Sequence, residues 1–92
     1  MREEFYLFTF ESTHGAISTE KLLKPLGVTI MPVPRKISTS CGIAVRVPID
    51  LMPKAAGIFR SGTDLSDDEY RVYKITQDKA ADLFECEVYE LP

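Results

Sequence analysis

Short hydrophobic segments with a regular period constrain the fold of this chain more than any other feature. Four runs rich in aromatic and β-branched residues are typical of strands, at residues 5–10, 28–33, 43–47 and 70–75. Two stretches with apolar residues at helical spacing lie between them, one after the first run and one after the third. The sequence therefore predicts the order strand, helix, strand, strand, helix, strand.

This order of elements predicts an α+β fold, a ferredoxin-like βαββαβ sandwich. In such a sandwich two helices cover one face of a four-stranded antiparallel sheet. We expect residues 1–92 to form a single domain, since the length suits one small core and no linker-like stretch interrupts it. Residues 76–92 follow the last strand as a C-terminal extension, which we expect to add an edge strand or a short helix.

Capping residues set the expected ends of the two helices. Ser12 or Thr13 is a natural N-cap for the first helix, and Gly27 marks its end. Asp50 is expected to cap the second helix, and Gly62 is expected just past its end.

The segment that joins the second and third predicted strands combines rigidity, positive charge and a cysteine. Its sequence is PVPRKISTSCG, residues 32–42, and its prolines fix φ and cannot donate to a sheet ladder. Gly42 tolerates unusual backbone angles and leaves room for a ligand or partner beside Cys41. Basic side chains favour the thiolate, which is the nucleophilic form of cysteine. The basic candidates are Arg35, Lys36 and Arg46.

The predicted topology brings a second segment toward this cysteine. Because crossovers are right-handed, the start of the first helix and the loop between the second and third strands share one edge of the sheet. A helix N-terminus carries partial positive charge and free amide donors, which favour a thiolate or a persulfide. We expect Cys41 to be the catalytic residue, and the expected substrate-binding residues are Ser12, Thr13, His14, Arg35, Ser38, Ser40 and Gly42. His14 can equally be a solvated side chain, and the loop serines can equally be simple loop hydroxyls.

Several of these residues carry a resemblance to a known family. Residues 10–16 (FESTHGA), 20–23 (EKLL) and 32–35 (PVPR), with the SxxCG pattern of residues 38–42, resemble the small bacterial family of selenium/sulfur carrier-like proteins. The resemblance implies that Cys41 holds sulfur or selenium as a persulfide-type adduct and exchanges it with donor and acceptor proteins. The C-terminal extension departs from the family pattern.

The second cysteine has a different setting. Cys86 alternates with Phe84 and Val88 in a strand-like run, so we expect its thiol on an apolar, buried side of the extension. A resolving role for Cys86, in which it pairs with Cys41, is the alternative.

Charge and composition exclude several classes of protein. A formal net charge of −3 lacks the basic excess of a nucleic-acid binder. No apolar run is long enough to span a bilayer, and two cysteines without a signal-peptide pattern indicate a reducing cytoplasm. We expect no cofactor and no metal, because Cys41 and His14 offer fewer ligands than a closed zinc site needs.

These observations favour a carrier protein over a turnover enzyme. Two alternatives stay open at this point. One is a non-catalytic interaction module, in which an apolar second face of the sheet forms a homodimer or docks a larger enzyme. The other is a thiol redox protein, in which Cys41 consumes peroxide.

Overall fold

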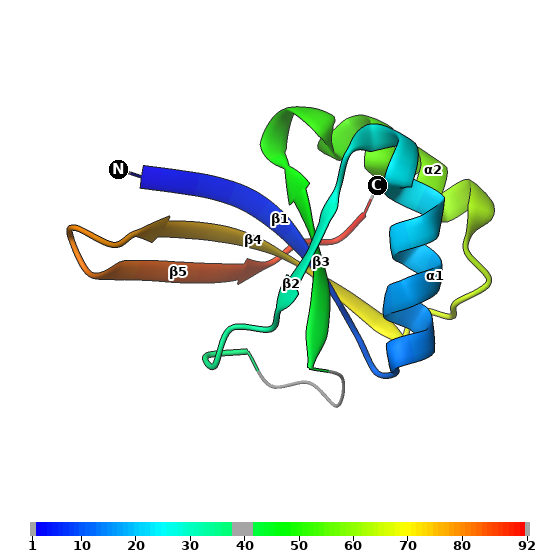
Figure 1. The fold of residues 1–92 in the computed structure, drawn as a ribbon, viewed down its shortest axis with the longest axis horizontal. Coiled ribbons are helices and arrows are strands. Elements are labelled where there is room, and N and C mark those ends of the chain that lie inside the picture. The colour runs from blue at the N-terminus through cyan, green and yellow to red at the C-terminus, as the bar shows by residue number, and fades with distance from the viewer. Residues whose placement is uncertain (1, 38–41, 92) are drawn as a thin grey trace.

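The computed structural model describes residues 2–37 and 42–91 of the chain, which form strands, two α-helices and two 3₁₀ turns (Figure 1). Their bounds are β1 (Arg2–Phe10), α1 (Thr13–Leu23), the 3₁₀ turn η1 (Lys24–Leu26), β2 (Thr29–Pro32), β3 (Ile43–Pro48), the 3₁₀ turn η2 (Ile49–Leu51), α2 (Met52–Gly62), β4 (Tyr70–Asp78) and β5 (Leu83–Val88).

The strands form one five-stranded antiparallel sheet in the order β2-β3-β1-β4-β5. The aromatic strand β1 lies at the centre, where Phe8 pairs with Val45 of β3 on one side and with Val72 of β4 on the other. A central strand pairs on both sides, and side chains of β1 are buried on both faces of the sheet, which suits a run that is apolar on both faces. The α+β class is confirmed.

The predicted number of strands is wrong, because the sheet has five strands and not four. The additional strand, β5, comes from the C-terminal extension and returns beside β4. Asp78 accepts hydrogen bonds from the amides of Ala80 (3.0 Å) and Ala81 (3.3 Å), and Asp82 has a φ of 52°. Asp residues tolerate this left-handed conformation and form local turns, so the sequence after β4 reverses the chain.

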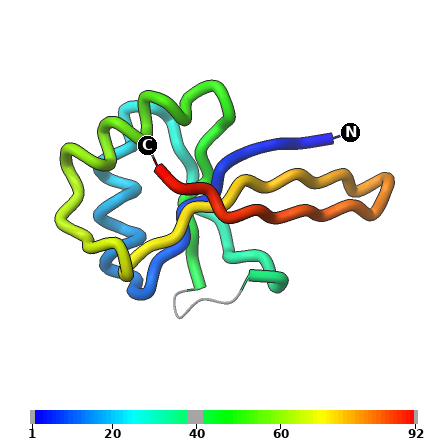
Figure 2. The backbone as a smooth tube through the Cα atoms, turned by 180° about the vertical axis from the view of Figure 1, so that it is seen from behind, coloured from blue at the N-terminus to red at the C-terminus, as the bar shows by residue number. Residues whose placement is uncertain are grey.

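Both helices cover the same face of the sheet, here called the helix-side face (Figures 1 and 2). Phe59 of α2 lies at the centre of this packing, with its ring 5.0 Å from Phe8 and 4.8 Å from Tyr70, both edge to face. The buried residues of this core are Phe8, Phe10, Ala16, Leu23, Val45, Val47, Met52, Ala55, Ala56, Phe59 and Val72.

The opposite face of the sheet has a smaller core of its own, and we call it the loop-side face. Phe5, Leu7, Ala44 and Ile75 are buried there together with Ile37, which comes from the loop after β2. The chain that follows β2 therefore packs across the face that the helices leave uncovered.

The expected helix ends are partly correct. Ser12 is the N-cap of α1, and its Oγ accepts a hydrogen bond from the Gly15 amide at 3.2 Å. Asp50 does not cap α2, because it lies within η2 and α2 begins only at Met52, without a side-chain cap. The chain enters α2 through a 3₁₀ turn after Pro48, which displaces the helix start past the acidic residue.

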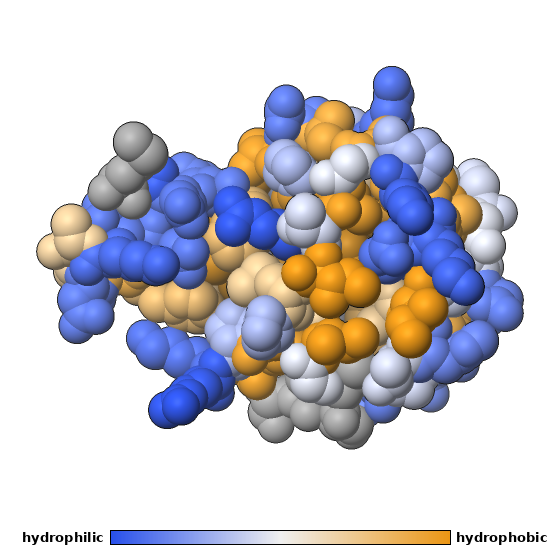
Figure 3. Space-filling model, in the orientation of Figure 1, coloured by the Kyte–Doolittle hydropathy of each residue, from blue (hydrophilic) through white to orange (hydrophobic). Residues whose placement is uncertain are grey.

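Apolar side chains gather on the surface over β2 and α1 (Figure 3). Ile17 of α1 is 42% exposed and Ile30 of β2 is 44% exposed. The exposure of Ile30 is high because β2 is an edge strand of the sheet. No helix in the described part of the chain is long and apolar enough to cross a membrane.

Candidate functional site

The strand register places the start of α1 and the two arms of the cysteine loop at one edge of the sheet. Thr9, near the end of β1, pairs with Ala44, and Pro32 at the end of β2 pairs with Ile43. The chain passes from β1 into α1 at the edge where it also leaves β2 and enters β3 (Figures 1 and 2). The elements that carry the predicted site residues therefore meet at this edge.

The loop between β2 and β3 is held at its base and on one arm. The Val33 amide donates to the Gly42 carbonyl at 3.1 Å, which joins the two ends of the loop. The Ile37 amide donates to the Pro34 carbonyl at 3.0 Å, which closes a turn. Ile37 is only 7% exposed, so its side chain anchors this arm to the loop-side face. These contacts frame the short segment between Ile37 and Gly42, to which Cys41 belongs.

Three of the predicted site residues, Ser38, Ser40 and Cys41, lie outside the described residues. Arg35 is exposed in the turn after Pro34. Gly42 is also exposed, and among the described atoms nothing lies within 4 Å of the point where a Cβ would stand. The space beside the Cα of Gly42, the residue that follows Cys41, is therefore open among the described atoms.

The other predicted site residues form the start of α1. Ser12 is engaged as the N-cap, while Thr13 and His14 are exposed in the first turn. The first turn contains no acidic residue that would neutralise the positive end of the helix dipole. The positive end of the helix dipole is therefore not neutralised from within the first turn.

Two basic side chains of this region lie over aromatic rings on the loop-side face. Lys36 Nζ is 5.2 Å from the centroid of the Phe84 ring, and Arg46 Cζ is 4.1 Å from that of Phe5. At these distances a cation and a ring face attract each other. Both cations lie on the face opposite to α1, so the described loop arm and the start of α1 share an edge of the sheet and not a face.

Sequence reasoning missed Phe84, Phe5 and Ile37 as partners of the loop. Phe84 belongs to β5, and its contact with Lys36 exists only because β5 adds to the sheet beside β4. The alternation of β1 places Phe5 on the face opposite to Phe8, which is the one signal the sequence offered.

The prediction that Cys86 is buried is wrong, because its side chain is exposed. It lies on β5 opposite Ile75, and β5 is an edge strand on which the neighbouring Val88 is also 63% exposed. Partial burial nevertheless raises the pKa of the Cys86 thiol, since desolvation disfavours the thiolate. Cys86 is thus an accessible thiol that ionises less readily than a free cysteine.

In the described part of the chain, no three His, Cys, Asp or Glu side chains come together in a way that could hold a metal ion.

Comparison with known protein families assigns the chain to one of them. The model of the family described as "Putative Se/S carrier protein-like" matches residues 5–63, which contain most of β1, the elements from α1 to α2 and the whole cysteine loop. The chain belongs to this family. The matched region ends before β4, so two of the five strands of this carrier-like protein lie outside it. No curated protein and no solved structure matches the chain.

Proposed function

We propose that the protein is a sulfur or selenium carrier that holds a persulfide-type adduct on Cys41. The observation that carries the proposal is the family match, which spans the loop with its SxxCG pattern. The contacts that hold the two arms of that loop, the Val33–Gly42 hydrogen bond and the packing of Ile37, also support it. A carrier needs a cysteine that a partner can reach and a fold that positions it.

The proposed transfer requires no external oxidant or reductant. The Cys41 thiolate attacks the terminal sulfur of a persulfide on the donor protein, a new S–S bond forms, and the old S–S bond breaks. The donor cysteine leaves as a thiolate, so electrons and sulfur atoms balance. An acceptor nucleophile then attacks the terminal sulfur on Cys41 and releases the Cys41 thiolate. Selenium in place of the terminal sulfur follows the same steps.

In this proposal the neighbouring residues have separate roles. Gly42 leaves the approach to the sulfur open, which fits the free space at its Cα. Arg35 and the first-turn amides of α1 stabilise the anionic adduct. Ser12, Thr13 and His14 position that helix start, and Ser38 and Ser40 donate hydrogen bonds from within the loop. Ile37 and the Val33–Gly42 hydrogen bond hold the loop in place.

We further propose that residues 1–92 form one domain of ferredoxin-like type, with β5 appended at the sheet edge beside β4. The strand order β2-β3-β1-β4, with α1 and α2 on one face, supports this assignment. The proposed setting is the cytoplasm, where reduced thiols persist. The proposed partners are a donor and an acceptor of sulfur or selenium.

Transfer from a purified cysteine desulfurase supplied with sulfur-labelled cysteine tests the function. Wild type is expected to take up label that dithiothreitol releases, Cys41→Ser is expected to take up none, and Cys86→Ser is expected to match wild type. Arg35→Ala is expected to lose the label faster than wild type. Arg2→Ala is the matched control, because Arg2 is an exposed arginine at the far end of β1.

Two results would overturn the proposal. Wild type that stays unlabelled with several desulfurases, supplied with cysteine or with selenocysteine, would favour an interaction module. Rapid consumption of peroxide that depends on Cys41, without transferable label, would favour a thiol redox protein.

A further inference from the structure

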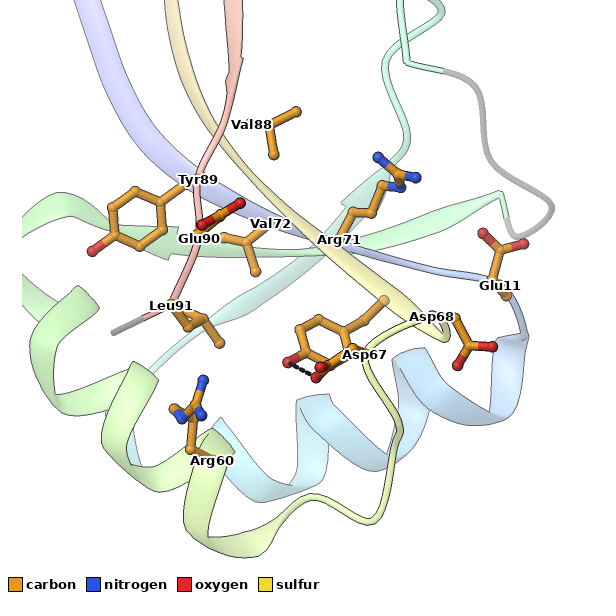
Figure 4. A pocket seen from close by; sticks show the side chains of 11 residues that line it. Glu11, Arg60, Asp67, Asp68, Arg71, Val72, Val88, Tyr89, Glu90 and Leu91 are labelled. Atoms are coloured by element: carbon orange, nitrogen blue, oxygen red, sulfur yellow. Dashed lines mark hydrogen bonds between the residues drawn. The ribbon is translucent and has the colours of Figure 1, made fainter.

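A hollow of about 450 Å³ lies beside the start of β4, where the C-terminal tail follows β5 (Figure 4). It is bounded by the last turn of α2, the turn that precedes β4 and the tail after β5. All of its lining residues except Glu11 and Arg60 lie beyond residue 63, outside the region that matches the family. The hollow is therefore built mainly by the part of the chain whose purpose the family does not explain.

The tail is fixed in place along one wall of the hollow. The Tyr89 amide donates to the Val72 carbonyl at 2.8 Å, and the Tyr89 ring lies 4.7 Å from the Tyr6 ring. Tyr89 and Leu91 both pack against the helix-side core. Val72, Leu91 and the ring of Tyr70 contribute apolar groups to its floor, and the rest of the lining is mostly charged. A pocket of this size that combines apolar and charged groups suits a small, charged organic ligand.

Opposite charges flank the Tyr70 hydroxyl on this floor. The hydroxyl donates a hydrogen bond to the Asp67 carboxylate at 3.5 Å. Partial burial and the Asp67 charge raise the pKa of Tyr70, while the Arg60 charge lowers it, so both charges act on the same group. Figure 4 shows Arg60 rising from α2 beneath Leu91, and Asp67 on the turn before β4.

Arg60 and Asp67 do not pair with each other. Among the described residues, Arg60 forms no ion pair within 4.0 Å. A positive and a negative group that do not pair with each other can each pair with the opposite charge of one ligand. The four acidic groups of the lining, Glu11, Asp67, Asp68 and Glu90, outnumber its two arginines, so they disfavour a ligand that carries only a carboxylate.

We propose that this hollow binds a free α-amino acid with an apolar side chain. The α-carboxylate pairs with the Arg60 guanidinium, and the α-ammonium pairs with the Asp67 carboxylate. The side chain of the ligand lies on Val72 and Leu91. None of the described lining residues belongs to the cysteine loop, and the proposal stands or falls independently of the carrier function.

Titration of the full ¹⁵N-labelled chain with L-leucine tests the proposal by NMR. Saturable shifts are expected at the amides of residues 60, 67–72 and 89–91. N-acetyl-L-leucine, which lacks the ammonium group, and L-leucinamide, which lacks the carboxylate, are each expected to bind at least about tenfold more weakly, since each loses a charge-assisted pair.

Variants separate the two charged contacts from a general effect on the surface. Arg60→Gln and Asp67→Asn are each expected to weaken L-leucine binding about tenfold or more. Arg71→Gln is the matched control, because Arg71 lines the same hollow but its guanidinium points away from Arg60 (Figure 4). Unchanged resonances elsewhere show that each variant is folded.

The proposal is overturned if L-leucine gives no saturable shifts at these amides. It is also overturned if N-acetyl-L-leucine or L-leucinamide binds as tightly as L-leucine, or if Arg71→Gln weakens binding as much as Arg60→Gln.

Discussion

Replacing Ile37 by Ala tests whether the cysteine loop is anchored on the sheet. The Ile37 side chain is 7% exposed and packs in the core of the loop-side face with Phe5, Leu7, Ala44 and Ile75. The substitution removes Cγ1, Cγ2 and Cδ1, which at about 0.8 kcal/mol per buried carbon group amounts to about 2 to 3 kcal/mol. This value lies near the lower end of measured core truncations to Ala.

Urea unfolding, followed by circular dichroism, measures the loss. For a domain of this length the same change lowers Tm by roughly 10 to 20 °C. Ile17→Ala is the matched control, because Ile17 is 42% exposed on α1 and Ala is a good helix former. The control is expected to change the unfolding free energy by less than about 1 kcal/mol. If Ile37→Ala costs less than about 0.5 kcal/mol, as an ordinary exposed loop residue would, the anchoring argument is refuted.

Three further predictions concern local features. Ser12→Ala is expected to lower the unfolding free energy by about 1 kcal/mol in urea titrations, while Ser12→Asp, which keeps an N-cap acceptor, should cost little; equal losses would contradict the capping role. Gly27→Ala is expected to lower the unfolding free energy by about 1 to 2 kcal/mol, because the φ of Gly27 is 79°. Gly57→Ala, within α2, is expected to leave the unfolding free energy unchanged or to raise it by up to about 1 kcal/mol. A clear loss of unfolding free energy in both variants would contradict the argument. The rate at which iodoacetamide labels Cys86 is expected to rise with pH, with a midpoint that is higher in the folded protein than in urea, because burial raises the pKa of the thiol. The Cys41→Ser variant is used so that only Cys86 is labelled. The stabilisation from the protonated, partly buried Cys86 thiol is then fully present below the unfolded-state pKa and is lost as the pH rises through the folded-state pKa. A labelling midpoint in the folded protein at or below that of the unfolded protein would contradict the raised pKa.

The central part of the fold follows from local patterns in the sequence. The aromatic run of β1 and the capping hydroxyl of Ser12 are strong local signals, and the structure agrees with both. The ends of strands were less predictable. β1 begins at Arg2, since residues 2–4 pair with residues 76–78 of β4 and not because they are buried. Hydrophobic periodicity detects burial, and it cannot detect a ladder between polar residues.

The candidate site was predictable in its elements but not in its contacts. Strand order alone implies that the start of α1 and the loop share an edge of the sheet. The position of Lys36 over Phe84 could not be foreseen, because it depends on β5 and on the packing of Ile37. Cys86 was misplaced for a related reason. Its alternation with Phe84 is real, but its side chain is exposed on the edge strand β5.

Mass spectrometry of the protein purified without reductant tests the carrier function most directly. The peptide that contains Cys41 is expected to carry the added mass of one sulfur or selenium atom, and dithiothreitol is expected to remove it. The peptide that contains Cys86 serves as the internal control and is expected to be unmodified. Unmodified Cys41 in protein from several growth conditions with added sulfur or selenium, or an adduct found on Cys86 alone, would contradict the proposed role of Cys41.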